Sequence, residues 1–353
     1  MMPSLSRRDF LLAGTALTTA TLGGCFGGSK AAAVVYAALD REFSDPILQQ
    51  FAAASGKSVL PKYDLESTKT VGLVTEIMQQ AKNPRCDLFW NNEILHSIRL
   101  EKAGLLEPYT PKRAAEFPAQ YQAANHTWHG FAARARVLII NKKLIPAKND
   151  YPTSFYQIAD DIRWQGKCGF ARPIFGTMAT QAAVLFATAG ESFAKEFFLN
   201  AKKNAAMLSG NKQVAEAVGR GDLAWGITDT DDAWVEHLRG RDIDIVFPDQ
   251  DENEEGTLLV PNTLCLIKNS PQQAIAKELI DYLLTPEIED QLAIGESAQF
   301  PLHPAAKNKS LVLKKFLPAD APPLKWQQVD FAAAADAWQT AGEFLQRELI
   351  DKQ

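Results

Sequence analysis

The chain has 353 residues, of which 46% are hydrophobic and 22% are charged, and its formal net charge is −5. These proportions are ordinary for a globular protein, and the length is enough for two lobes with separate cores. A mildly acidic chain lacks the basic surface that nucleic acid requires, so we expect no nucleic-acid partner.

The first residues predict export. Ser6-Arg7-Arg8-Asp9-Phe10-Leu11 is a twin-arginine pattern, and an apolar stretch follows up to Leu22. The stretch is shorter than the roughly twenty apolar residues of a membrane-spanning helix, which predicts a signal peptide over residues 1–24. Leu22-Gly23-Gly24-Cys25 resembles a bacterial lipobox, so Cys25 is predicted to carry a lipid and residues 25–31 to form a flexible tether. We therefore predict a periplasmic or other extracytoplasmic, membrane-anchored protein; the alternative is plain cleavage with Cys25 unmodified.

Three further cysteines, Cys86, Cys168 and Cys265, each lie in or beside an apolar, strand-like run. An odd number of exposed thiols would be unfavourable in an oxidising compartment. We therefore expect these three to be buried free thiols.

Strand and helix patterns alternate in the first part of the chain. Helices are indicated by apolar residues three or four apart, and strands by short apolar runs. In chain order we predict a strand over 34–37, a helix that Ser44-Asp45-Pro46 caps and Gly56 ends, a strand from 59, a helix around 71–78, a strand over 87–90 and a helix over 93–104.

A long strand over 136–141 is predicted to cross into a second lobe, where the alternation restarts. There we predict strands over 169–171 and 224–228 and helices over 177–189, 194–204 and 213–219. Strands over 257–260 and 263–267 form the return crossing, and helices over 271–284 and 331–349 finish the chain. The predicted fold class is α/β with two lobes: residues 32–133 and 258–300 form lobe one, 134–257 form lobe two, and 301–353 form a C-terminal helical segment packed on the lobes.

Several motifs carry a family resemblance over nearly the whole chain beyond the signal peptide. They are Val34 to Arg41, Asp87 to Glu93, Ala103 to Tyr109, Arg134 to Val137, Trp164 to Lys167, Asn211 to Gly221 and Thr285 to Glu287. In these the chain resembles the family 1 extracellular solute-binding proteins, in the branch of iron(III)-binding periplasmic proteins of ABC importers. The resemblance implies a class II periplasmic-binding-protein fold, with a mostly parallel sheet in each lobe, a ligand cleft between the lobes, and docking on a membrane permease.

One position departs from that branch. Its ferric site is built on two adjacent tyrosines after the strand that corresponds to residues 224–228, and this chain has Thr230 and Asp231 there. Two ligand classes therefore stay open. One is Fe(III) or another metal ion, held by carboxylates with a small anion on Arg134. The other is a small polar or phosphate-bearing organic molecule.

Candidate ligand contacts lie where loops follow strands, because ligands of α/β sheets bind beyond the carboxyl ends of the strands. Asp229, Asp231 and Asp232 open a helix; they either cap it or hold a metal ion or an amine. Arg134 lies on the crossing strand and either clamps an anion or pairs with the other lobe. The remaining candidates offer hydroxyl, amide or carboxylate groups: Glu66, Ser67, Thr68, Asn91, Asn92, Glu93, Gly176, Thr177 and Asn262.

These residues define the expected chemistry. The metal set, if the ligand is an ion, is Asp229, Asp231 and Glu93, and the ion is transported cargo, so we expect no cofactor. The sequence has no nucleophile elbow, P-loop or zinc motif, so we expect a binding protein that is not an enzyme. We expect this protein to be a monomer, with an ABC importer permease and a small ligand as its partners. The alternative from another class is a surface-attached hydrolase or adhesin.

Overall fold

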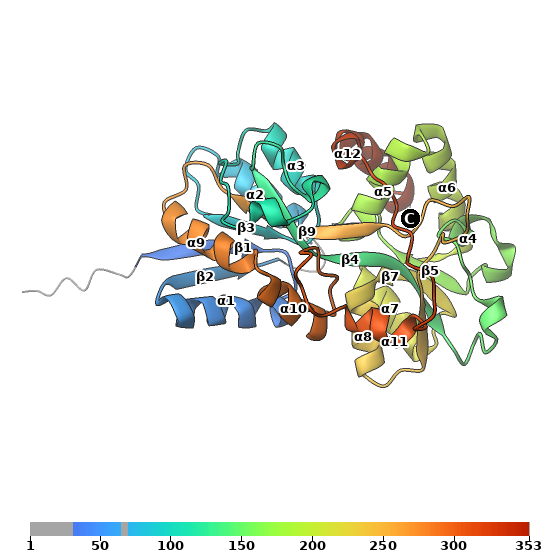
Figure 1. The fold of residues 1–353 in the computed structure, drawn as a ribbon. Helices are drawn as coiled ribbons and strands as arrows, with labels where there is room; N and C mark the ends of the chain where they lie inside the picture. Colours follow the sequence, from blue (N-terminus) through green and yellow to red (C-terminus); the bar gives the residue numbers. More distant parts are fainter. Residues whose placement is uncertain (1–30, 65–69, 353) are drawn as a thin grey trace, which may run out of the picture. The chain divides into compact units, whose positions relative to one another are not determined.

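The computed structural model describes residues 31–64 and 70–352. The predicted signal peptide and Cys25 lie outside the described residues. The described chain is built on one nine-stranded sheet in the order β2-β1-β3-β9-β4-β7-β5-β6, with β8 paired to β4 (Figure 1). Helices pack against this sheet, so the predicted alternation of strands and helices is present.

The first group of elements forms one end of the sheet. Strands β1, β2 and β3 pair in parallel, and β3 pairs with β9 in antiparallel orientation. Two apolar clusters fill the space between these strands and their helices, and they include Phe89, Trp90 and Leu264. The elements are β1 (Ala32–Ala37), α1 (Arg41–Ser55), β2 (Ser58–Tyr63), α2 (Val71–Gln79), β3 (Leu88–Asn91), α3 (Leu95–Lys102), two short 3-10 turns (Ala114–Glu116 and Ala119–Tyr121), α9 (Gln273–Leu283) and α10 (Pro286–Ile294).

The second group forms the other end. Strand β5 pairs in parallel with β6 and β7, and β4 pairs in antiparallel orientation with β7 and β8. Trp225, Phe170 and Phe198 lie in its largest apolar cluster. The elements are α4 (Gln157–Asp160), β5 (Cys168–Ala171), α5 (Gly176–Thr188), α6 (Glu191–Asn204), β6 (Ala206–Leu208), α7 (Asn211–Arg220), β7 (Trp225–Asp229), α8 (Thr230–Leu238), β8 (Ile243–Val246), α11 (Leu311–Phe316) and 3-10 turns at Lys148–Asp150 and Ile162–Trp164.

Two strands join the groups. β4 (Trp128–Asn141) is buried along its whole length; it pairs with β9 up to Ala135 and with β7 and β8 from Arg136 onward. β9 (Leu259–Leu266) is one continuous strand, so the prediction of two return strands separated by Pro261-Asn262 is wrong. The ladder shifts register opposite Pro261, at Ala132, whose φ is +39°. This bulge accommodates a proline, which has no N–H to donate, inside a central strand.

The start of the first helix also differs from the prediction. α1 begins at Arg41, so Ser44 lies inside the first turns and Pro46 lies in the helix. The Ser44 hydroxyl donates to the backbone oxygen of Asp40 at 3.0 Å. The helix starts early because Phe43 packs in the core beneath β1. Gly56 ends the helix in the left-handed conformation, at φ +66°, as predicted.

The C-terminal helix α12 (Phe331–Leu345), followed by a π-helical turn (Gln346–Ile350), contacts both groups. It packs against α3 and α5 (Figure 1). The guanidinium of Arg99 lies 3.8 Å from the ring centroid of Trp338, and Phe344 contacts Phe186 at 6.2 Å between centroids. The predicted boundaries of the lobes and of residues 301–353 stay predictions.

Gly226 of β7 allows α7 to approach the strand closely. Gly169 and Gly226 are register partners on β5 and β7. A Cβ at Gly226 would lie 2.5 Å from Cγ1 of Val214 and 2.9 Å from the backbone oxygen of Gly169.

We expect Gly226→Ala to lower the free energy of unfolding by about 1–3 kcal/mol in urea denaturation, because the added methyl group overpacks the core. Gly342→Ala on α12, where a Cβ meets nothing within 4 Å, is the control and should not destabilise the protein; equal losses in both variants would contradict this packing argument.

Cys86, Cys168 and Cys265 are buried free thiols. That prediction is confirmed. Within the described residues, no helix has the length and apolar character needed to cross a membrane.

Candidate ligand-binding site

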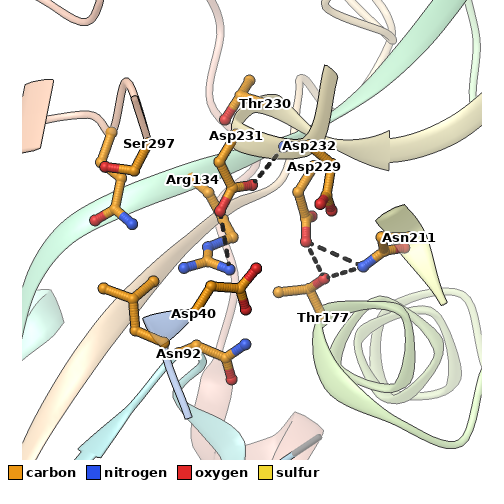
Figure 2. A network of polar contacts seen from close by, with 12 residues as sticks. Asp40, Asn92, Arg134, Thr177, Asn211, Asp229, Thr230, Asp231, Asp232 and Ser297 are labelled. Carbon is orange, nitrogen blue, oxygen red and sulfur yellow. Dashed lines mark hydrogen bonds and ion pairs between the residues drawn. The ribbon is translucent and has the colours of Figure 1, made fainter. Parts of the chain in front are cut away.

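Three aspartates meet at the junction of β7 and α8. Asp229 ends the strand, and Asp231 and Asp232 lie in the first turn of the helix. Each offers a carboxylate oxygen, and these oxygens lie within 4.8 Å of one another. Asp229 occupies the N-cap position of α8, but its side chain forms no hydrogen bond that caps the helix among the described residues. Figure 2 shows the three side chains close to one another, with Asp231 directed toward Arg134 and Asp229 toward Thr177.

Two buried arginines of β4 meet this carboxylate group. Arg136 lies 2.6 Å from Asp229 and Arg134 lies 3.3 Å from Asp231, and all four side chains are almost fully buried. Burial lowers the pKa of Arg134, but the surrounding carboxylates outweigh this effect, so its pKa lies above the ordinary value. Arg134 therefore pairs with the start of α8, and its predicted roles as an anion clamp and as a link to the other lobe stay predictions.

Neighbouring polar groups hold Asp229 in place. Its Oδ2 accepts hydrogen bonds from the Thr177 hydroxyl at 2.5 Å and from the Asn211 amide at 3.0 Å. Gly176, at φ +52°, opens α5 directly before Thr177. Thr230, at one predicted tyrosine position, is fully buried and accepts a hydrogen bond from the backbone N–H of Ala135. Thr177 thus contacts the aspartate group, and Thr230 joins α8 to β4.

The opposite side of the cleft contributes Asp40 and Asn92. Figure 2 shows the Asp40 side chain reaching toward Arg134 from the loop between β1 and α1, and the Asp40 charge acts on the pKa of Arg134. The Asn92 oxygen accepts a hydrogen bond from the Thr70 hydroxyl at 2.6 Å. Asp40 was not among the predicted ligand contacts, although it follows a strand and precedes a helix, which is the same pattern that indicated the other candidates.

Asn91 and Glu93 stabilise the start of α3 through hydrogen bonds. The Glu93 carboxylate accepts hydrogen bonds from the backbone N–H groups of Leu95 and His96 and from the Asn91 amide. It also accepts one from the Thr180 hydroxyl of α5 at 3.1 Å. Burial raises the pKa of Glu93, and these donors partly offset the effect. The three-carboxylate group does not include Glu93; its place as a metal ligand stays a prediction.

Asn262 takes part in a buried network at the β4 bulge. Its amide donates to the backbone oxygen of Ala132 and to Gln299, and its oxygen accepts from Arg134 at 3.2 Å. The candidates Glu66, Ser67 and Thr68 lie outside the described residues. Asn262 therefore orients Arg134, and the sequence prediction of direct ligand contact stays untested.

Two pockets open beside the carboxylate group. Their volumes are about 340 and 310 Å³, and Asp40, Glu42 and Lys212 line both of them. Lys212 of α7 and Glu42 of α1 form an ion pair of 3.6 Å across the cleft. Asp232 lines the larger of these two pockets, so this pocket begins at one edge of the three-aspartate group.

The charge at the centre of the cleft is negative. Four carboxylates, those of Asp40 and of the three aspartates at the start of α8, act on the guanidinium group of Arg134, and one of them, Asp229, pairs with Arg136. Two negative charges remain after these formal charges are balanced. Because both arginines already pair with aspartates, the arrangement favours a positively charged ligand over an anion.

Two groups of strands and helices are joined by the crossing strands β4 and β9, and polar side chains from both groups converge between the groups. This arrangement is that of a two-lobed solute-binding protein. Residues 95–324 match the model of the bacterial extracellular solute-binding protein family. The chain belongs to this family. The predicted resemblance and the predicted two-lobed fold are both confirmed.

Individual relatives are similar over most of the chain. Iron uptake protein A2 of Synechocystis is 24% identical over an alignment of 323 residues that covers 86% of this chain and 88% of the relative. Iron-bound HitA from Pseudomonas aeruginosa has a TM-score of 0.76 at 21% identity, covering 90% of this chain and 99% of that one. The periplasmic binding protein AfuA from Actinobacillus pleuropneumoniae, with fructose-6-phosphate bound, also has a TM-score of 0.76, at 18% identity and covering 91% and 99%.

Proposed function

We propose that this chain is the extracytoplasmic binding component of an ABC importer and that its cleft binds a cation, with Fe(III) as the first candidate. It captures the solute between its lobes and releases it to a permease. Family membership supports a role in transport over the alternative of a hydrolase or adhesin, so we also propose that the chain has no enzymatic activity. Closure then follows from contacts that both lobes make to the ligand only in the shut state.

One observation carries the choice of a cation. The carboxylate oxygens of Asp229, Asp231 and Asp232 lie within 4.8 Å of one another. Carboxylates are hard oxygen donors that suit a highly charged metal ion. Asp40 brings a further carboxylate from the opposite lobe, which lets a bound cation join the lobes. The names of the relatives, an iron uptake protein and iron-bound HitA, support testing Fe(III) first.

A phosphate-bearing organic molecule is the second candidate. Nε of the buried Arg134 has no hydrogen-bond partner among the described residues, and Gly176 and Thr177 open α5 toward the site. A guanidinium and a helix N-terminus together suit a phosphate group. AfuA with fructose-6-phosphate shows that a similar fold accepts such a molecule. The existing pairing of Arg134 with Asp231 weighs against it here.

Thermal denaturation with separate ligands tests the proposal. A cation at a hundred times its Kd should stabilise the fold by about 2.7 kcal/mol, and native mass spectrometry should show one ion per monomer. Fe(III) supplied as its nitrilotriacetate complex is the first probe, and glucose-6-phosphate is the opposing one. Stabilisation by the phosphate ester and by no cation would overturn the proposed function.

The attachment to the membrane is part of the same proposal. Twin-arginine export and lipid on Cys25 would place the binding lobes beside the permease, with residues 25–31 as the tether. The mass of the mature protein isolated from membranes should include a diacylglyceryl group and lack residues 1–24. Cys25→Ser should release the protein into the soluble fraction; an unchanged membrane fraction would contradict lipid anchoring.

A further inference from the structure

The larger cleft pocket has more space than a metal ion needs. Its volume is about 340 Å³, within the range of small-molecule sites and roughly ten times the share of one water molecule. Both lobes line it, since Phe43 comes from α1 and Val235 and Leu238 come from α8. Val235 also packs against the apolar cluster that contains Phe43. We call this pocket the side chamber.

The side chamber combines apolar walls with excess negative charge. Five acidic residues and two basic residues line it, and both bases form ion pairs with acids of the same lining: Lys212 with Glu42 at 3.6 Å and Arg239 with Glu236 at 2.6 Å. The other three acidic residues of the lining are Asp40, Asp232 and Glu296. The formal charge of the lining is therefore −3, next to aliphatic and aromatic surface.

A metal ion explains only part of this arrangement. Carboxylates satisfy an ion coordinated by oxygen, but Phe43, Val235 and Leu238 offer it no ligand atom. An organic molecule with a positive charge uses both features, since its ammonium group contacts carboxylates while its carbon skeleton covers apolar surface.

A second group lies next to the lining of the chamber and requires an acceptor. Arg134 is 2% exposed, and its Nε has no hydrogen-bond partner within the described parts of the chain. Figure 2 shows its guanidinium beside Asp40, which lines the side chamber. A buried donor without a partner is unfavourable, and an oxygen atom of a bound solute would satisfy it.

We propose that the solute carried in this cleft is an organic amine that also bears hydroxyl or other acceptor oxygens. Its ammonium group binds the three-aspartate group from the side of Asp232, the member that lines the side chamber, and an oxygen accepts from Arg134. Its carbon skeleton occupies the side chamber against Phe43, Val235 and Leu238. This inference rests on the proposed function, because both require a cation at the three aspartates. It adds the chemical class of that cation.

Calorimetric titration of the mature protein, freed of metal by dialysis against a chelator, tests this inference. The probes are ethanolamine and glucosamine, each compared with its uncharged counterpart, ethylene glycol or glucose. We expect an amine to bind at least a hundredfold more tightly than its uncharged counterpart and to compete with Fe(III) for the same site. Leu238→Trp, which narrows the side chamber, should weaken amine binding at least tenfold, whereas Leu199→Trp, on the partly exposed surface of α6, should leave it unchanged.

Each outcome has a distinct meaning. Binding of Fe(III) with no binding of either amine overturns the inference and leaves the proposed function standing. Amine binding that Leu238→Trp and Leu199→Trp affect equally places the molecule elsewhere and also overturns it. If neither Fe(III) nor an amine binds but glucose-6-phosphate does, both the inference and the proposed function are wrong. Unchanged melting temperatures in both tryptophan variants establish that the proteins compared are folded.

Discussion

Asp231→Asn is expected to lower the affinity for the cation, whether Fe(III) or an amine, by about a hundredfold. The substitution keeps the shape of the side chain and removes one negative charge from the three-carboxylate group. Loss of a charged hydrogen bond costs up to about 3 kcal/mol, and 1.4 kcal/mol corresponds to a factor of ten in Kd. Titration calorimetry of the variant and the parent protein measures the change directly.

The same variant separates the two ligand classes. Asp231 pairs with Arg134 at 3.3 Å, so its neutralisation leaves more of the arginine charge for an anion. A phosphate ester should therefore bind Asp231→Asn more tightly than it binds the parent. Asp222→Asn is the matched control, because Asp222 is exposed and pairs with Arg220 away from the site. Equal cation affinity in Asp231→Asn and in the control would exclude the three aspartates as the binding group.

Arg136→Met is expected to lower the free energy of unfolding by about 3–5 kcal/mol, the largest stability effect we predict. Arg136 and Asp229 form a fully buried ion pair of 2.6 Å, and the arginine also donates to Gln181 and Thr177. Removing one partner leaves the Asp229 charge buried without its counterion, which is the main cost. Urea denaturation followed by circular dichroism measures the change.

A double variant tests that explanation. In Arg136→Met combined with Asp229→Leu no charge is left behind, so much of the lost stability should return. Arg220→Met, which breaks the exposed pair with Asp222, should change stability by less than about 1 kcal/mol. A double variant whose loss of stability equals the sum of the two single losses would show no coupling between Arg136 and Asp229, and it would contradict this explanation.

Local patterns in the sequence were sufficient to predict most elements. The apolar spacing of α2 and α7 and the glycine that ends α1 depend on residues near one another in the chain, and all are present in the structure. The start of α1 was missed because burial of Phe43 against the sheet, a tertiary contact, extends the helix toward β1. The continuity of β9 was missed because Pro261 is tolerated only opposite the bulge at Ala132.

The candidate site divides in the same way. Three aspartates at the start of one helix are a local feature, and the sequence alone identified them, just as it identified the family. The pairing of Asp229 with Arg136 and of Asp231 with Arg134 joins residues about a hundred positions apart in the chain, and Asp40 arrives from the other lobe. Which strands lie side by side decides these contacts, and with them the sign of the charge left in the cleft. The sequence therefore determined the class of protein, and only the tertiary structure indicated that its cleft favours a cation, because the net charge at a buried site depends on which charges the fold brings together.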